Sequence, residues 1–238
     1  MRMRTFVWMA VLFGLIFMAY PAICEDAEQT ETNVIGEVEM ISESDVSEEM
    51  DELRGSDIKV QKADQYLAEK GFVPNEEITK DNFFGLKQSY AGLKDGMETE
   101  GTYELLIQEY SNTDSENAAA VGRTVVRVAD GNMSEYTFVL EAPKTNVSQI
   151  AEYYVAESAG ELEIMAANSW WTCMLGQLPV IGEECASGLE TCASENSSIV
   201  GYLGCIATNC GEGFAKSSVC CSCDCNNWCE WAYGCCHM

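Results

Sequence analysis

Residues 124–140, Thr-Val-Val-Arg-Val-Ala-Asp-Gly-Asn-Met-Ser-Glu-Tyr-Thr-Phe-Val-Leu, hold two strand signals with a turn signal between them. β-Branched residues dominate 124–128, and large apolar residues occupy alternate positions of 136–140, which is the two-residue period of a strand. Asp130 and Gly131, which lie between these runs, are the residue types that a tight hairpin turn needs. The stretch therefore predicts a β-hairpin.

The region upstream of this hairpin adds a strand and a helix. Large apolar residues again alternate within 103–107, which predicts a third strand. A helix is expected from 57 to 70, because apolar residues recur there at helical spacing and Gly71 supplies a C-terminal stop. Residues 56–167 are therefore interpreted as an α+β domain with a small antiparallel sheet.

The last part of this domain predicts a second helix, from Thr145 to about Ala167. Asn146 and Gln149 have the three-residue spacing of a helix capping box. Asn146 also opens an N-glycosylation sequence, as do Asn132 and Asn196. The two roles of Asn146 compete, because a side chain that caps a helix is poorly placed to carry a sugar.

The first residues have the layout of a secretory signal peptide. Arg2 and Arg4 form a positive start, residues 6–19 are apolar, and small residues at the −3 and −1 positions permit cleavage after Cys24. The alternatives are an uncleaved signal anchor and a lipoprotein acylated at Cys24. We expect a signal peptide at 1–24 and a secreted protein.

The segment 25–55 is strongly acidic and has no basic residue before Arg54. Self-repulsion and scarce apolar residues predict a disordered leader. A solvated acidic helix is the alternative, since Val38, Ile41 and Val46 are only loosely spaced. The whole chain has a formal net charge of −26, which excludes nucleic acid as a partner because phosphate binding needs clustered Lys and Arg.

Cysteines divide the chain in two. Of 13 cysteines, all except Cys24 lie within 173–236, so removal of a signal peptide leaves an even number in a compartment where disulfides persist. Their partners cannot be deduced from the sequence, although the adjacent Cys220 and Cys221 should bond to different partners. The predicted disulfide cysteines are Cys173, Cys185, Cys192, Cys205, Cys210, Cys220, Cys221, Cys223, Cys225, Cys229, Cys235 and Cys236.

Residues 168–238 are predicted to form a small, mainly helical, disulfide-rich C-terminal domain. Apolar residues and cysteines recur at helical steps within 185–192 and again within 199–210. Asn196 or Ser197 could cap the second helix. The two helices predict a helical hairpin that disulfide bonds hold together, which matters because about 70 residues otherwise give a marginal core.

Aromatic residues of this C-terminal region are candidates for contact with a target, since tryptophan favours surfaces that are apolar on one side and wet on the other. The alternative is that they form the region's own core. The candidates are Trp170, Trp171, Trp228, Trp231 and Tyr233.

Enzyme and cofactor signatures are missing from the sequence. The single histidine, His237, is the penultimate residue, and no HExxH motif is present. A thiolate metal cluster with His237 is an alternative to disulfides, but exported thiolates tend to become oxidised. We therefore expect disulfide bonds, no cofactor and no catalysis.

A signal peptide, an acidic cysteine-free body and a compact cysteine-rich C-terminal region together resemble the precursors of the halocin C8-like bacteriocins. The resemblance lies in this layout and in 173–236, which has the short apolar run 174–182, cysteines at wide helical spacing and a final cysteine cluster. The final cluster is denser and more aromatic than that family's pattern.

This resemblance implies that a protease acting near 166–171 releases residues 168–238 as a peptide that kills competing cells through their membrane or a surface protein. It also implies that the pro-region, 56–167, binds the peptide and confers immunity. One alternative is a secreted binding module, such as a protease inhibitor or a surface-interaction protein. Another is extracellular metal binding by thiolates.

Overall fold

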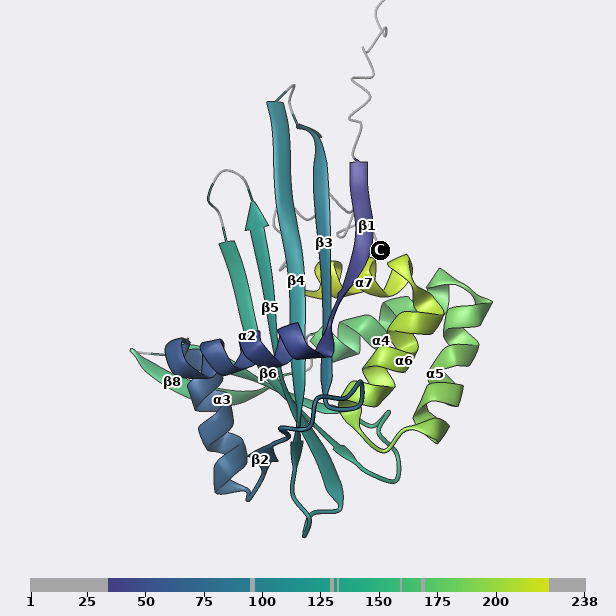
Figure 1. Ribbon diagram of the computed structural model, residues 1–238. Helices are drawn as coiled ribbons and strands as arrows, with labels where there is room; N and C mark the ends of the chain where they lie inside the picture. The colour runs from purple at the N-terminus through teal and green to yellow at the C-terminus, as the bar shows by residue number, and fades with distance from the viewer. Residues whose placement is uncertain are drawn as a thin grey trace, which may run out of the picture. The chain divides into compact units, whose positions relative to one another are not determined.

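The hairpin predicted from residues 124–140 lies at the centre of an antiparallel sheet in the computed structural model (Figure 1). Its strands pair from Asn117↔Pro143 to Arg127↔Met133. Gly131 follows the first strand with a φ of 86°, a conformation that favours glycine. The hairpin prediction is therefore confirmed.

The structure describes residues 34–94, 97–128, 131, 133–158, 160–167 and 170–222. The expected signal peptide at 1–24 lies outside these residues. So do residues 25–33 of the expected leader and everything beyond Ser222.

The sheet is larger than the small one that the sequence predicted. Over the described residues it has eight strands, seven of them in the order β1-β3-β4-β5-β6-β7-β8, and β2 pairs with β4. Polar residues and glycines interrupt the alternating pattern in the long strands β3 and β4. Most of their length therefore carries no clear strand signal in the sequence. The strands are β1 (Val34–Ile41), β2 (Val73–Pro74), β3 (Phe83–Lys94), β4 (Met97–Ser111), β5 (Asn117–Val128), β6 (Met133–Pro143), β7 (Ala151–Ser158) and β8 (Glu161–Ala167).

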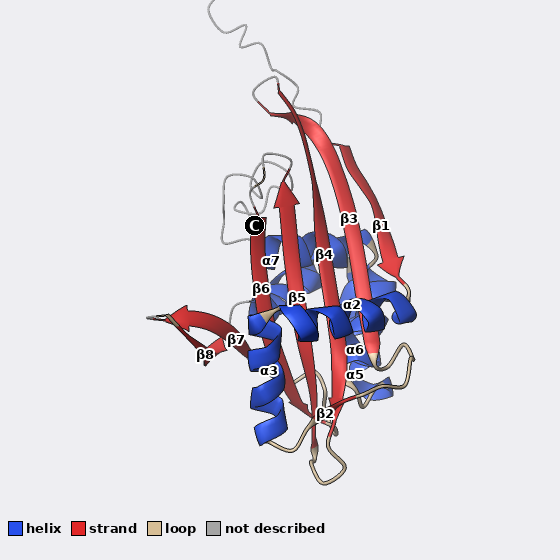
Figure 2. Cartoon of the chain, turned by 60° about the vertical axis from the view of Figure 1, so that its left-hand side comes forward, coloured by secondary structure: helices blue, strands red, loops and turns tan. Residues whose placement is uncertain are grey.

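Helices α2 (Glu43–Ser56) and α3 (Ile58–Glu69) cover one face of the sheet (Figure 2). The helix predicted over 57–70 is confirmed as α3. Asp57 caps its start by accepting hydrogen bonds from two backbone amides, and Gly71, with a φ of 81°, follows its end.

The disordered leader expected at 25–55 is wrong for residues 34–55, which form the edge strand β1 and most of α2. Ser42 caps α2 by accepting a hydrogen bond from the amide of Asp45. Val46 and Met50 are four residues apart and fully buried against the sheet. An acidic helix folds here because a sheet is present to cover its apolar residues, and average composition does not reveal this.

The helix predicted from Thr145 to Ala167 is also wrong, since most of the segment forms the hairpin β7-β8. Val155 pairs with Ile164 across this hairpin, and Gly160 has a φ of 83° in its turn. Large apolar residues alternate along both strands and pack on the side of α2 and α3. The apolar residues at alternate positions therefore predict this segment correctly as strands, whereas the apparent capping box predicted a helix that does not form.

In the part of the cysteine-rich region that the structure describes, four helices cover the opposite face of the sheet (Figure 1). The predicted helical hairpin is confirmed as α5 and α6. Ser198, rather than Asn196 or Ser197, caps α6 by accepting a hydrogen bond from the amide of Gly201. The helices are α4 (Trp170–Ile181), α5 (Glu183–Glu195), α6 (Ile199–Cys210) and α7 (Glu212–Ser222).

Candidate functional site

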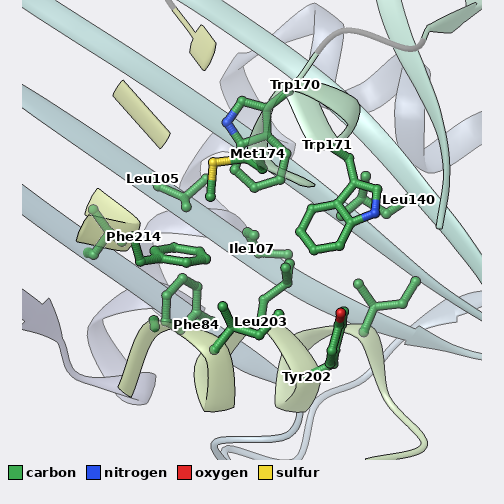
Figure 3. Close-up of a cluster of buried hydrophobic side chains, with 14 of the residues drawn as sticks. Phe84, Leu105, Ile107, Leu140, Trp170, Trp171, Met174, Tyr202, Leu203 and Phe214 are labelled. Atoms are coloured by element: carbon green, nitrogen blue, oxygen red, sulfur yellow. The ribbon is translucent and has the colours of Figure 1, made fainter. Parts of the chain in front are cut away.

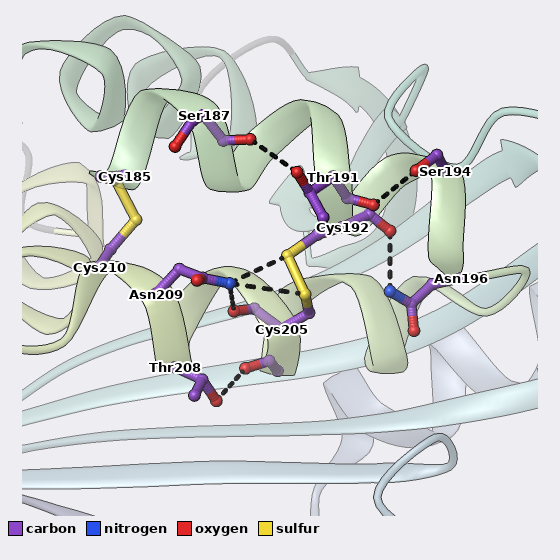
Figure 4. Close-up of a disulfide and its surroundings, with 11 residues drawn as sticks. Cys185, Ser187, Thr191, Cys192, Ser194, Asn196, Cys205, Thr208, Asn209 and Cys210 are labelled. Carbon is purple, nitrogen blue, oxygen red and sulfur yellow. Dashed lines mark hydrogen bonds between the residues drawn. A yellow bond between two sulfur atoms is a disulfide. The ribbon is translucent and has the colours of Figure 1, made fainter. Parts of the chain in front are cut away.

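Among the described residues, disulfide bonds join the helices α4 to α7 in pairs. Two bonds connect α5 to α6 (Figure 4), and one bond connects α4 to α7. Cys220 is also disulfide-bonded, so it and Cys221 have different partners, as predicted. Bonds of this kind indicate an oxidising environment. Those between described residues are Cys173–Cys221, Cys185–Cys210 and Cys192–Cys205.

The apolar sides of these helices face the sheet, and the two parts share one hydrophobic cluster (Figure 3). The ring of Trp170 stacks on that of Phe138 in β6, with 5.0 Å between centroids. Phe214 of α7 meets Phe84 of β3 edge to face, at 5.9 Å. Sheet and helices therefore bury each other's apolar surface, and we call this contact the sheet–helix interface.

Two of the residues predicted to contact a target lie inside this interface. Trp170 is fully buried and Trp171 is 2 % exposed. In the intact chain they therefore contact the sheet and the neighbouring helices instead of solvent. Trp228, Trp231 and Tyr233 lie outside the described residues.

A carboxylate from the sheet lies at the start of α4. Glu152 of β7, which is 4 % exposed, accepts hydrogen bonds from the backbone amides of Trp170 at 3.3 Å and Trp171 at 2.7 Å. The hydroxyl of Tyr136 donates to the same carboxylate at 2.6 Å. The first amides of a helix have no partner within the helix, and the helix dipole favours negative charge there. Glu152 thus acts as a helix cap supplied by another segment.

A second carboxylate has the same role at α6. Glu109 of β4, also 4 % exposed, accepts hydrogen bonds from the backbone amides of Ile199 at 3.3 Å and Val200 at 3.0 Å. Ser198 takes the next available amide, that of Gly201. Together they satisfy three of the first amides of this helix.

Burial raises the pKa of Glu109 to about 8. The two backbone amides and Lys144 act in the opposite direction, and the negative charge of Asp81 adds to the rise. Desolvation wins because the carboxyl group is almost entirely removed from water. Glu109 therefore changes charge near neutral pH while it holds the start of α6.

We expect the free energy of unfolding to fall between pH 5 and pH 9 because of Glu109. The folded chain binds this proton more tightly than the unfolded chain, where the pKa is near its ordinary value of 4.5. The resulting stabilisation is complete below about pH 4.5 and is lost as the pH rises through about 8.

Urea unfolding at several pH values tests this expectation. In Glu109→Gln the free energy of unfolding should fall less between pH 5 and pH 9. The control Glu100→Gln, at an exposed position of the same strand, should show the same fall as the wild-type chain. Equal pH dependence in the wild-type chain and Glu109→Gln would contradict the assignment.

A third polar contact connects the sheet to α7. The hydroxyls of Tyr103 in β4 and Ser218 in α7 form a buried hydrogen bond, and Ser222 lies 3.5 Å from the same tyrosine oxygen. Burial raises the pKa of Tyr103, so its hydroxyl keeps its proton and stays available as a donor. Helices α4, α6 and α7 are each therefore joined to the sheet by polar contacts as well as by apolar packing.

Two of the three asparagines predicted to carry sugars make local hydrogen bonds, and the third lies outside the described residues. The Asn146 side chain accepts a hydrogen bond from Ser148 in a turn, so it does not cap a helix. The Asn196 side chain donates to the carbonyl of Cys192 at the end of α5. Asn132 is not among the described residues.

Sequence reasoning missed both Glu109 and Glu152. The chain has 39 acidic residues, so no single carboxylate stands out by type. A signal for Glu109 exists, however, because it continues the alternate positions 103–107, whose residues face the C-terminal helices. A carboxylate on the apolar face of a strand needs partners across the interface.

Among the described residues, no helix is long and apolar enough to span a bilayer. No group of three or more His, Cys, Asp and Glu residues among them is placed to hold a metal ion.

Comparison with known proteins does not assign this arrangement to a family. No family model matches the chain, and neither a curated protein nor a solved structure matches it.

Proposed function

We propose that the chain is the secreted precursor of a disulfide-stapled antimicrobial peptide. Proteolysis near 166–171 releases residues 168–238, which act on the membrane or a surface protein of a competing cell. The region 56–167 stays behind as a protective partner of the peptide.

The observation that carries this proposal is that the sheet–helix interface is apolar and that no disulfide bond can cross it. It buries large aromatic side chains of the cysteine-rich region, among them Trp170 and Trp171. No cysteine occurs from 25 to 172, so no disulfide bond can join residues 56–167 to the released peptide. A single cut would therefore leave two parts held only by non-covalent contacts.

The same interface explains how one part would restrain the other. A contiguous apolar surface that includes large aromatic side chains favours binding to a lipid surface or to another protein. While the sheet covers it, that surface is not accessible. Separation of the two parts would expose it, and the disulfide bonds would keep the released helices folded and resistant to proteases.

Intact-mass analysis of culture medium from producing cells, with and without reduction, tests the proposal. We expect a fragment with the mass of about residues 168–238. Each disulfide bond takes up two hydrogens on reduction, so the twelve cysteines within 173–236 imply a gain of twelve hydrogens. The fragment should inhibit growth of related cells, and its reduced and alkylated form should not.

Two results would contradict the proposal. If the medium contains only the intact chain, no precursor is processed. If the protein inhibits a protease stoichiometrically and leaves growth unaffected, it is a secreted binding module instead.

A further inference from the structure

We propose that the sheet is a folding template for the C-terminal helices, and that it selects their native disulfide pairing by holding the starts of α4 and α6 at Glu152 and Glu109. This function does not depend on release of the helices. It is required while the chain folds, whatever happens to it afterwards.

The four helices have little ability to arrange themselves. They contain 12, 13, 12 and 11 residues. Isolated helices shorter than about 12–15 residues are marginal in water. Most of their large apolar side chains are buried in one cluster with residues of β3 to β6. Without the sheet these side chains would collapse on one another, and the cysteines have many alternative pairings.

Apolar packing alone does not define one arrangement, because it is not directional. Hydrogen bonds are directional. Glu152 accepts from two successive amides of α4, and Glu109 accepts from two successive amides of α6. Both hydrogen bonds of a glutamate form only when the helix begins at one particular residue and is rotated about its axis by one particular angle. The carboxylates therefore set the register of both helices on the sheet.

Register determines which cysteines can bond. The Cα atoms of Cys173 and Cys221 are 5.6 Å apart, and those of Cys192 and Cys205 are 5.7 Å apart. A slip of one helical turn moves a residue by about 5.4 Å. Cα atoms more than about 7 Å apart cannot be bridged without backbone movement. A slip of one turn in α4 or α6 thus removes its cysteines from reach of their native partners.

The two carboxylates should affect different bonds. Glu152 holds Trp170 and Trp171, close to Cys173, whose bond to Cys221 closes the longest sequence separation of the three, 48 residues. Glu109 holds α6, which carries the partners of the two α5 cysteines at separations of 13 and 25 residues. Each carboxylate therefore guides the bonds of the helix that it caps.

The oxidation itself needs an external disulfide. A protein thiolate attacks that disulfide and forms a mixed disulfide, and a second protein thiolate then displaces the remaining external thiol. Two protein thiols are oxidised to one bond, and one external disulfide is reduced to two thiols. The sheet contributes no electrons and acts only by placing the second thiolate.

The test is oxidative refolding of the reduced, denatured full chain in a glutathione buffer, followed by disulfide mapping of peptides by mass spectrometry. Glu152→Leu removes the acceptors at α4 and keeps a side chain of similar size. We expect it to lower the yield of Cys173–Cys221 at least about fivefold relative to Cys192–Cys205. Glu109→Leu should instead lower the yield of Cys192–Cys205 relative to Cys173–Cys221.

The matched controls are Glu157→Leu in β7 and Glu100→Leu in β4, at exposed positions of the same two strands. They should give the wild-type distribution of bonds. The ratio between bonds is the measured quantity, so it can be read even where total refolding yield is low. A wild-type distribution in Glu152→Leu, or an equal loss of all three bonds in both variants, would overturn the proposal.

Discussion

Replacement of Trp170 by alanine is expected to destabilise the folded chain by about 3–5 kcal/mol, the usual cost of truncating a buried aromatic side chain. Trp170 is fully buried in the sheet–helix interface, and its ring stacks on Phe138 and lies 6.2 Å from that of Trp171. Truncation leaves a cavity lined by residues from both sides. Helices and strands are rigid elements, so this cavity cannot close without moving α4.

Urea unfolding of the full chain at fixed pH measures the loss. Leu175→Ala is the matched control, since Leu175 belongs to the same helix but is 38 % exposed. We expect this control to lose less than about 1 kcal/mol. A loss of less than about 1 kcal/mol in Trp170→Ala would show that the interface contributes little to stability.

Removal of the bond between Cys173 and Cys221 by a double substitution to serine is expected to cost about 3–4 kcal/mol. The chain-entropy relation gives about 4 kcal/mol for the separation of 48 residues. The bonds between α5 and α6 lie within this loop and shorten its effective length, which brings the value toward 3 kcal/mol. The effect is large because this bond joins α4 to α7, which are not adjacent in sequence.

Unfolding in urea without reductant provides the measurement. The comparison is the double serine variant of Cys192 and Cys205, whose bond spans only 13 residues and is expected to contribute about 3 kcal/mol. If this variant were the less stable of the two, loop closure could not be the main source of stabilisation.

Local patterns in the sequence determined several elements correctly. The hairpin of β5 and β6 follows from β-branched residues on one side of a turn and alternating apolar residues on the other. Helix α3 follows from apolar residues at helical spacing and from Gly71, and the paired helices α5 and α6 follow from apolar residues and cysteines at helical spacing. These signals act between residues close in sequence, so each can be read from one stretch of chain.

Other local patterns failed because a distant segment outweighed them. The acidic segment at 34–55 folds because the sheet covers Val46 and Met50. The apparent capping box at Asn146 has no helix to cap, because the following residues alternate and complete the sheet. Both errors arose where tertiary burial, rather than composition or propensity, decided the structure.

The sequence by itself determined that a cysteine-free body precedes a disulfide-rich helical region, since cysteine positions and apolar periods are properties of the chain. Only the tertiary structure decided that these helices lie on the sheet, and that Glu109 and Glu152 hold their first amides. Glu109 is 90 residues from Ile199, and a backbone amide is the same in every residue except proline. No residue type marks such a partner, so the contact becomes visible only after the chain has folded.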